Sequence, residues 1–131
     1  MRRGPLLYSH SLKAAKTAFA VIITAHMDIK ELSQEMHRFV AAKGWYSPNT
    51  PRPQTPRNIA ISLVLESSEV LEHFQWTDKT VNTEELAGEL ADVALYLLQL
   101  ASIQGIDLEQ AILKKLEKNY GRTWDQPEGS A

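Results

Sequence analysis

The sequence contains no cysteine, no strong excess of charge of either sign and no long apolar run. The absence of cysteine excludes disulfides, thiolate metal sites and a cysteine nucleophile. A net charge of −2 without a basic run argues against a nucleic-acid backbone as partner. No uninterrupted apolar stretch approaches the ~20 residues that span a bilayer, so no membrane partner is expected. These features predict a soluble, cytoplasmic chain of 131 residues, long enough for one domain with a buried core.

The periodicity of apolar residues predicts helices only, with no strand alternation and no internal repeat. Four helices are expected, each preceded by a capping residue, namely Asp28, Thr55, Asn82 and Asp107. They are expected to end before Gly44, at about Trp76, at Gln104 and before Gly121. The predicted fold is therefore all-α, a four-helix bundle.

The bundle is expected to occupy residues 27–123. Residues 1–26 are predicted to be an appendage outside the functional core, with Met27 as an alternative natural start, and residues 124–131 a flexible tail. Residues 47–56 hold four prolines and are expected to form a loop; its composition favours a plain connector over the alternative of a lid above a site. Residues 90–100 are apolar on nearly every side, which is typical of a bundle centre or a subunit interface. In the last helix the predicted buried stripe consists of Leu108, Ile112 and Leu116.

Two acidic pairs stand at the same spacing on two of these helices. Glu66 pairs with Glu69, and Glu89 with Asp92; residues three apart share a helix face. The face of Glu66 is otherwise apolar, with Ile59, Leu63 and Val70. A single acidic residue on a helix is usually solvated. Two matching pairs on apolar helices instead favour a metal site, because buried carboxylates need neutralisation and Mg²⁺ prefers oxygen ligands.

These acids belong to a longer pattern that resembles the all-α nucleoside triphosphate pyrophosphohydrolases of the MazG type, in particular the dCTP pyrophosphatase-like branch. The resemblance covers residues 29–122. Besides the acids, the matching motifs are Phe39-x-x-x-x-Gly44-Trp45, Pro56-Arg57-Asn58-Ile59-Ala60, Phe74-Gln75-Trp76 and Lys115-x-x-x-Asn119. It implies a helical bundle assembled as a homodimer or homotetramer. It also implies Mg²⁺-dependent cleavage of a nucleoside triphosphate between the α and β phosphates.

The resemblance further implies a role for each matching residue. The metal ligands would be Glu66, Glu69, Glu89 and Asp92, with Mn²⁺ as an expected substitute for Mg²⁺. Glu69, beside Glu66, is the candidate general base. The substrate-binding residues would be Trp45 and Trp76 around the base, Tyr96 at the sugar, Lys115 and Asn119 at the phosphates, and Asn58.

One departure from the family pattern leaves base selectivity open. Relatives in this branch often carry a histidine just before the proline-arginine-asparagine segment, whereas Gln54 stands here in a longer loop. The expected substrate is dCTP or a related or non-canonical dNTP, consistent with house-cleaning or control of the dNTP pool. The alternatives are a phosphoribosyl-ATP-type pyrophosphohydrolase and a non-catalytic oligomerisation module whose acids form salt bridges. A di-iron site is excluded by spacing, because His73 follows Glu69 at i+4 rather than i+3.

Overall fold

The computed structural model describes residues 26–79 and 82–123, and these residues form four helices without strands, as predicted. The helices are α2 (Ile29–Ala42), α3 (Pro56–Glu72), α4 (Thr83–Ile103) and α5 (Leu108–Tyr120). All but His26 of the predicted appendage, and all of the predicted tail, lie outside the described residues.

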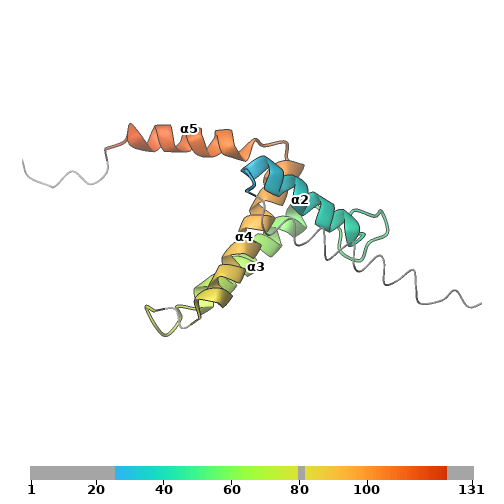
Figure 1. Ribbon diagram of the computed structural model, residues 1–131, viewed down its shortest axis with the longest axis horizontal. Coiled ribbons are helices and arrows are strands. Elements are labelled where there is room, and N and C mark those ends of the chain that lie inside the picture. Colours follow the sequence, from blue (N-terminus) through green and yellow to red (C-terminus); the bar gives the residue numbers. More distant parts are fainter. Residues whose placement is uncertain (1–25, 80–81, 124–131) are drawn as a thin grey trace, which may run out of the picture.

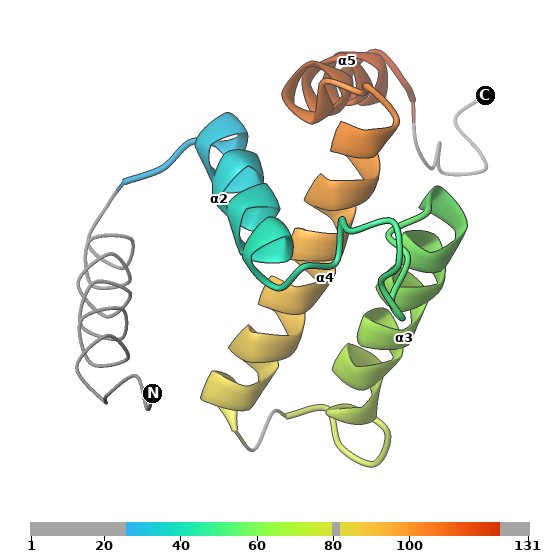
Figure 2. The same ribbon diagram turned by 90° about the vertical axis from the view of Figure 1, so that its right-hand side faces the viewer.

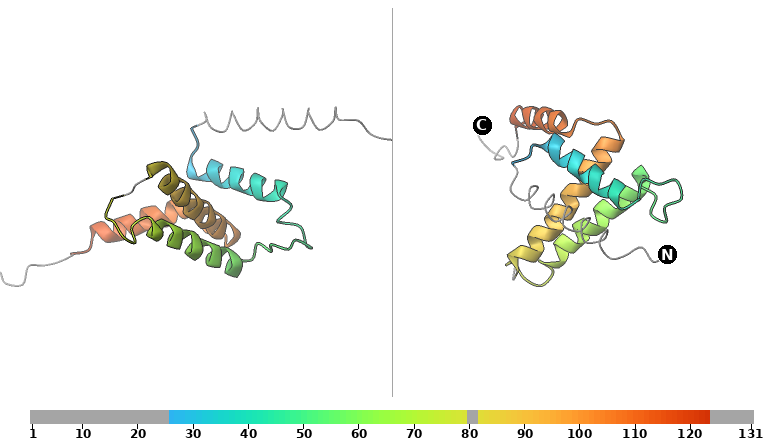
Figure 3. Two further views of the ribbon diagram at one scale, coloured as in Figure 1. Left: turned by 90° about the horizontal axis from the view of Figure 1, so that it is seen from below. Right: turned by 45° about the vertical axis from the view of Figure 1, so that its right-hand side comes forward.

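Helix α4 is the centre of the arrangement. It runs antiparallel to α3, with which it makes its most extensive contact, and α2 packs on its other side (Figures 1 and 2). Helix α5 leaves the far end of α4 and projects away from the α3–α4 pair (Figure 3). The described residues therefore form a packed set of three helices, and the fourth has its main contact at the end of α4.

Local capping explains where the helices begin. Asp28 and Glu31 form the predicted capping box: the Glu31 amide donates to Asp28 Oδ1 at 2.8 Å and the Asp28 amide to Glu31 Oε2 at 2.9 Å. Thr55 and Asp107 accept from the amides three residues ahead, also as predicted. Asn82 caps α4 through the amides of residues 84 and 85, without the reciprocal bond of a full box. Gly44 and Gly105 end their helices at φ +72° and +65°, where a glycine is favoured.

The predicted end of α3 is wrong by four residues. The helix ends at Glu72 rather than at Trp76. The amide of Phe74 donates to the carbonyl of Leu71 and that of Gln75 to the carbonyl of Glu72, so the chain tightens into i→i−3 bonds. Trp76 lies beyond this turn and is 89% exposed.

The core lies where α2 crosses the second half of α4 near the start of α3. Its buried apolar residues are Met36, Val40, Ile59, Leu98 and Ala101, and the single buried polar residue among the described ones is Gln99. The predicted stripe on α5 is not buried in the single chain: Ile112 and Leu116 are 42% and 47% exposed. The reason is that α5 projects from the bundle.

Helix α4 is also long and apolar enough to span a membrane by length and composition. Glu89 and Asp92 interrupt its apolar run, so the sequence contains no uninterrupted apolar stretch of that length there. The helix instead packs against α2, α3 and α5, and only 17% of its apolar window is buried within one chain. Its remaining apolar surface is therefore available to a further packing partner.

Candidate functional site

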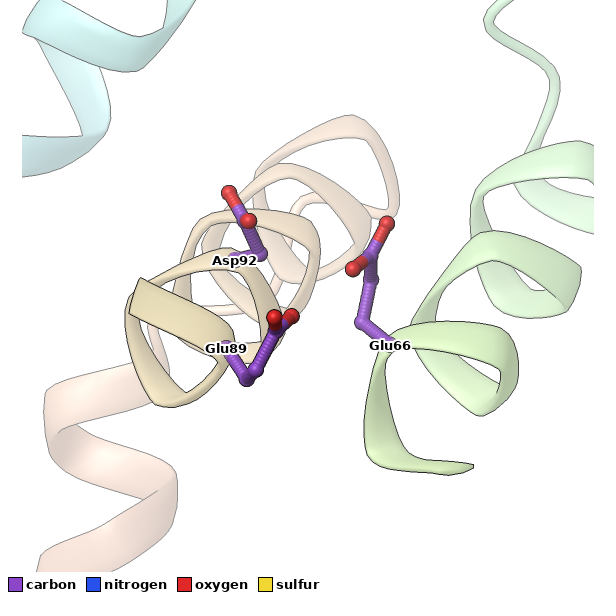
Figure 4. Close-up of side chains that lie close together, drawn as sticks. All are labelled: Glu66, Glu89 and Asp92. Carbon is purple, nitrogen blue, oxygen red and sulfur yellow. The ribbon is translucent and has the colours of Figure 1, made fainter. Parts of the chain in front are cut away.

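Three of the predicted metal ligands converge where α3 faces α4. Glu66 projects from α3, and Glu89 and Asp92 from consecutive turns of α4 (Figure 4). One carboxylate oxygen of each lies within 4.8 Å of the other two. Glu66 and Glu89 are half-buried and Asp92 is exposed, so the cluster is open to solvent on one side. The i, i+3 spacing and the antiparallel pairing of α3 with α4 together bring these oxygens to one point.

Glu69, the fourth predicted ligand, touches the cluster through Glu89. Desolvation raises the pKa of Glu89, and the Glu69 carboxylate lies close enough to Glu89 to raise it further, as do the charges of Asp92 and Glu66. Desolvation likewise raises the pKa of Glu66, followed by the charges of Glu69 and Asp92. The crowding of carboxylates therefore makes the ionisation of Glu66 and Glu89 less favourable.

Among the described residues, no lysine or arginine forms an ion pair with any of these four acids. The cluster thus differs from a set of structural salt bridges, which counts against the oligomerisation-module alternative. Hard carboxylate oxygens within a few ångströms of one another, with no cationic side chain paired to them in the described part of the chain, fit a divalent cation. The residues present therefore match the chemistry of the predicted metal.

A cavity of about 1080 Å³ adjoins the cluster and lies between α2, the proline-rich loop, the start of α3 and one face of α4. Three predicted substrate-binding residues line it: Trp45, Asn58 and Tyr96. Asp92 belongs to both the cavity wall and the acidic cluster. The cavity and the carboxylates are therefore one continuous site.

The proline-rich loop is more than a connector. Its residues 51–54 form part of the cavity wall. The guanidinium of Arg52 lies 5.4 Å from the centre of the Trp45 ring, and the Phe39 ring meets Trp45 edge-on at 5.8 Å. These contacts hold the Trp45 ring at the cavity wall.

Sequence reasoning missed Gln99, which lies buried in the cavity wall. Its amide nitrogen donates to Gln54 Oε1 at 2.8 Å and to the Tyr46 hydroxyl at 3.4 Å. Behind it the Tyr46 hydroxyl bonds to His37 Nδ1, and His37 Nε2 bonds to Ser102 Oγ at 2.7 Å. The available signal was a single amide side chain within an otherwise apolar helix segment, since buried polar groups require partners.

The remaining predicted substrate residues are not brought to the cavity within one chain. Trp76 lies in the turn after α3, and Lys115 and Asn119 lie on α5, which projects from the far end of α4 (Figure 1). None of the three lines the cavity. The site of a single chain thus holds the acids, Trp45, Asn58 and Tyr96.

Comparison with known proteins agrees with this arrangement. Residues 61–129 match the model of the MazG-like family. Over 104 residues the chain is 34% identical to dCTP pyrophosphatase 1 of Mus musculus and 35% identical to dCTP pyrophosphatase 1 of Homo sapiens. Each match covers 72% of this chain but 56% of the relative, so the chain spans little more than half the length of these relatives.

A solved structure extends the similarity to the fold. The crystal structure of a pyrophosphatase from Archaeoglobus fulgidus superposes with a TM-score of 0.61 at 33% sequence identity. The superposition covers 72% of this chain and 91% of the archaeal one. With the family match over more than half of its residues, this chain belongs to the MazG-like family.

Proposed function

We propose that the protein is a nucleotide pyrophosphohydrolase that converts a deoxynucleoside triphosphate to its monophosphate and pyrophosphate. The observation that carries this proposal is the position of Asp92, which joins a carboxylate cluster to a cavity walled by Trp45 and Tyr96. A triphosphate needs positive charge at one end of its site, and a base needs aromatic surface at the other. Relatives named dCTP pyrophosphatase 1 favour dCTP, or a related or non-canonical dNTP, as substrate.

The acids fit Mg²⁺, with Mn²⁺ as a substitute, held by Glu66, Glu89 and Asp92. When bound, such an ion neutralises phosphate charge and makes a water more acidic. The chain's own contribution is to concentrate carboxylates whose pKa values are raised by desolvation and by one another, as at Glu66 and Glu89. A bound cation relieves this repulsion, which supports the proposal that the cluster binds a cation.

Glu69 is the proposed general base. It adjoins Glu89, whose pKa it raises, but is not part of the group of three whose oxygens lie within 4.8 Å. A carboxylate next to the ligands, rather than among them, is suited to accept a proton from the attacking water. In Glu69→Gln we expect metal and nucleotide binding to remain measurable while turnover collapses. Equal loss of binding would make Glu69 a ligand instead.

Trp76, Lys115 and Asn119 are proposed to act on a nucleotide held by a second copy of the chain. Lysine is a common point-charge partner for phosphate, and tryptophan an effective stacking surface for a base. The exposure of Ile112, Leu113 and Leu116 on α5, and of much of α4, supports a homodimer or homotetramer. Light scattering that gives a 14.7 kDa species at micromolar concentration would contradict this assembly.

The proposed setting is the cytoplasm, where the enzyme would remove non-canonical deoxynucleotides or limit a dNTP pool. No nucleic-acid partner is proposed, in keeping with the net charge of −2. Membrane association is not proposed either, because the apolar helix α4 has packing partners within the chain.

The deciding experiment is a panel of dNTPs, NTPs and modified nucleotides with Mg²⁺, in which pyrophosphate and orthophosphate are assayed separately. Pyrophosphate release that is lost with EDTA and in Glu89→Gln would support the proposal and identify the preferred nucleotide. Release from phosphoribosyl-ATP alone would support that alternative. No release from any nucleotide by the folded protein would favour a binding module.

A further inference from the structure

The face of α4 that begins in the acidic cluster continues to the buried amide of Gln99. Asp92, Tyr96 and Gln99 stand at i, i+4 and i+7, and all three line the cavity. Seven residues of helix correspond to about 10 Å along its axis. This separation is comparable to that between the α-phosphate of a nucleotide and the far edge of its base. With phosphates at Asp92, the edge of the base would lie near Gln99.

The hydrogen-bond network fixes which end of the Gln99 amide faces the cavity. The backbone carbonyl of Arg52 can only accept, so the group that bonds to it at 2.8 Å must be the amide nitrogen of Gln54. The oxygen of Gln54 then faces Gln99 and accepts from its amide nitrogen at 2.8 Å. That nitrogen has a second acceptor in the Tyr46 hydroxyl. With both N–H groups directed into the network, Gln99 has its oxygen left to offer a ligand.

We propose that Gln99 selects the base, by accepting a hydrogen bond from an exocyclic amino group. The inference rests on the nucleotide-binding part of the proposed function. Cytosine and adenine carry such an amino group, whereas uracil and hypoxanthine carry a carbonyl at the same position. A carbonyl there would face the Gln99 oxygen, and two buried acceptors would be left without a proton between them. Sites built around a buried hydrogen bond discriminate strongly against ligands that cannot make it.

The test is equilibrium binding, monitored by tryptophan fluorescence in the presence of Mg²⁺, of two matched pairs of monophosphates: dCMP with dUMP, and dAMP with dIMP. The wild-type protein should bind the amino member of at least one pair about tenfold more tightly than the carbonyl member. In Gln99→Leu, with folding checked by circular dichroism, this ratio should fall close to one. If Gln99→Leu does not fold, Gln54→Ala serves instead, because it frees the Gln99 amide to rotate and should lower the same ratio.

Tyr46→Phe is the matched control. It removes the hydroxyl that joins Gln99 to His37, but Tyr46 does not line the cavity and Gln54 still orients Gln99. This variant should lose stability and keep the wild-type ratio. A purely structural role for Gln99 predicts that Gln99→Leu and Tyr46→Phe behave alike.

Three outcomes would overturn the inference. They are equal binding within both pairs by the wild type, tighter binding of the carbonyl members, and an unchanged ratio in folded Gln99→Leu. A different result would contradict the proposed hydrolysis alone: selective binding of the amino-bearing monophosphates, with no release of pyrophosphate from the corresponding triphosphates. Absence of binding by all four monophosphates would overturn the inference on Gln99 while leaving the hydrolysis assay to decide the function.

Discussion

The two halves of helix α4 differ in what they bury. The first half carries Glu89 and Asp92 and has no buried residue, whereas the buried residues Leu98, Gln99 and Ala101 all belong to its last two turns. The first half faces Glu66 and Glu69 across the α3 interface, and the second half faces α2 and the start of α3. Helix α4 therefore keeps the carboxylate cluster apart from the most deeply buried residues.

This separation has a physical cause. Carboxylates that repel one another lower the stability of the fold, and desolvation already raises the pKa of Glu66 and Glu89. A tightly packed surrounding would increase that penalty. Placing the acids beyond the core, near solvent and a cavity, keeps them ionisable while Ile59 and its neighbours hold the helices together.

The largest expected effect lies in the acidic half. Glu66→Gln removes a charge and one of the proposed oxygen ligands, so pyrophosphate release should fall by about 100-fold or more. Glu72→Gln is the matched control, since Glu72 lies on α3 outside the cluster, and its activity should stay near wild type. Steady-state kinetics with Mg²⁺ measure both. Equal activity in Glu66→Gln and wild type would remove Glu66 from the site.

A smaller effect, on stability, is expected in the packed half. Ile59 is 2% exposed, so Ile59→Ala leaves a cavity and should lower the free energy of unfolding by about 2–5 kcal/mol. Ile61 is 45% exposed two residues away, and Ile61→Ala should cost less than about 1 kcal/mol unless a second copy covers it. Urea unfolding at two protein concentrations separates these cases. If Ile59→Ala and Ile61→Ala lowered the free energy of unfolding by similar amounts at both protein concentrations, the position of the core around Ile59 would be contradicted.

The smallest expected effect is again in the acidic half of α4, where the removal of one charge should stabilise the fold. The raised pKa of Glu89 means that the folded state binds more protons than the unfolded state. Without metal, the stability from this group is present below the ordinary glutamate pKa and is lost as pH rises through the raised folded value. At pH 7 in EDTA, Glu89→Gln should therefore have a higher Tm than wild type, and the difference should shrink at acidic pH.

Metal addition should reverse that order. The proposed Mg²⁺ site exists only in the folded state, so Mg²⁺ should raise the Tm of wild type more than that of Glu89→Gln. Glu85→Gln, one turn earlier on α4 and outside the cluster, should respond to Mg²⁺ as wild type does. An equal response to Mg²⁺ in wild type and Glu89→Gln would show that the cluster is not the metal site.

Much of the fold could be predicted from the sequence because the relevant forces act over a few residues. The capping box of Asp28 and Glu31 and the left-handed glycines after α2 and α4 are local features. The i, i+3 acidic pairs are local as well, and antiparallel packing of their helices was enough to bring three of the acids together. The prediction for the end of α3 was wrong because no break in the apolar pattern of the sequence marks the turn after Glu72. That turn leaves Trp76 outside the helix.

The sequence by itself determined the helices, their caps, the acidic pairs and the family motifs. Only the tertiary structure decided that α5 projects from the bundle, that the proline-rich loop walls the cavity, and that Gln54 meets Gln99. The reason is the range of the interactions. Helix propensities and the hydrogen bonds within a helix turn depend on neighbouring residues. The Gln54–Gln99 hydrogen bond instead joins residues 45 positions apart. Its existence depends on how α2, α3 and α4 pack.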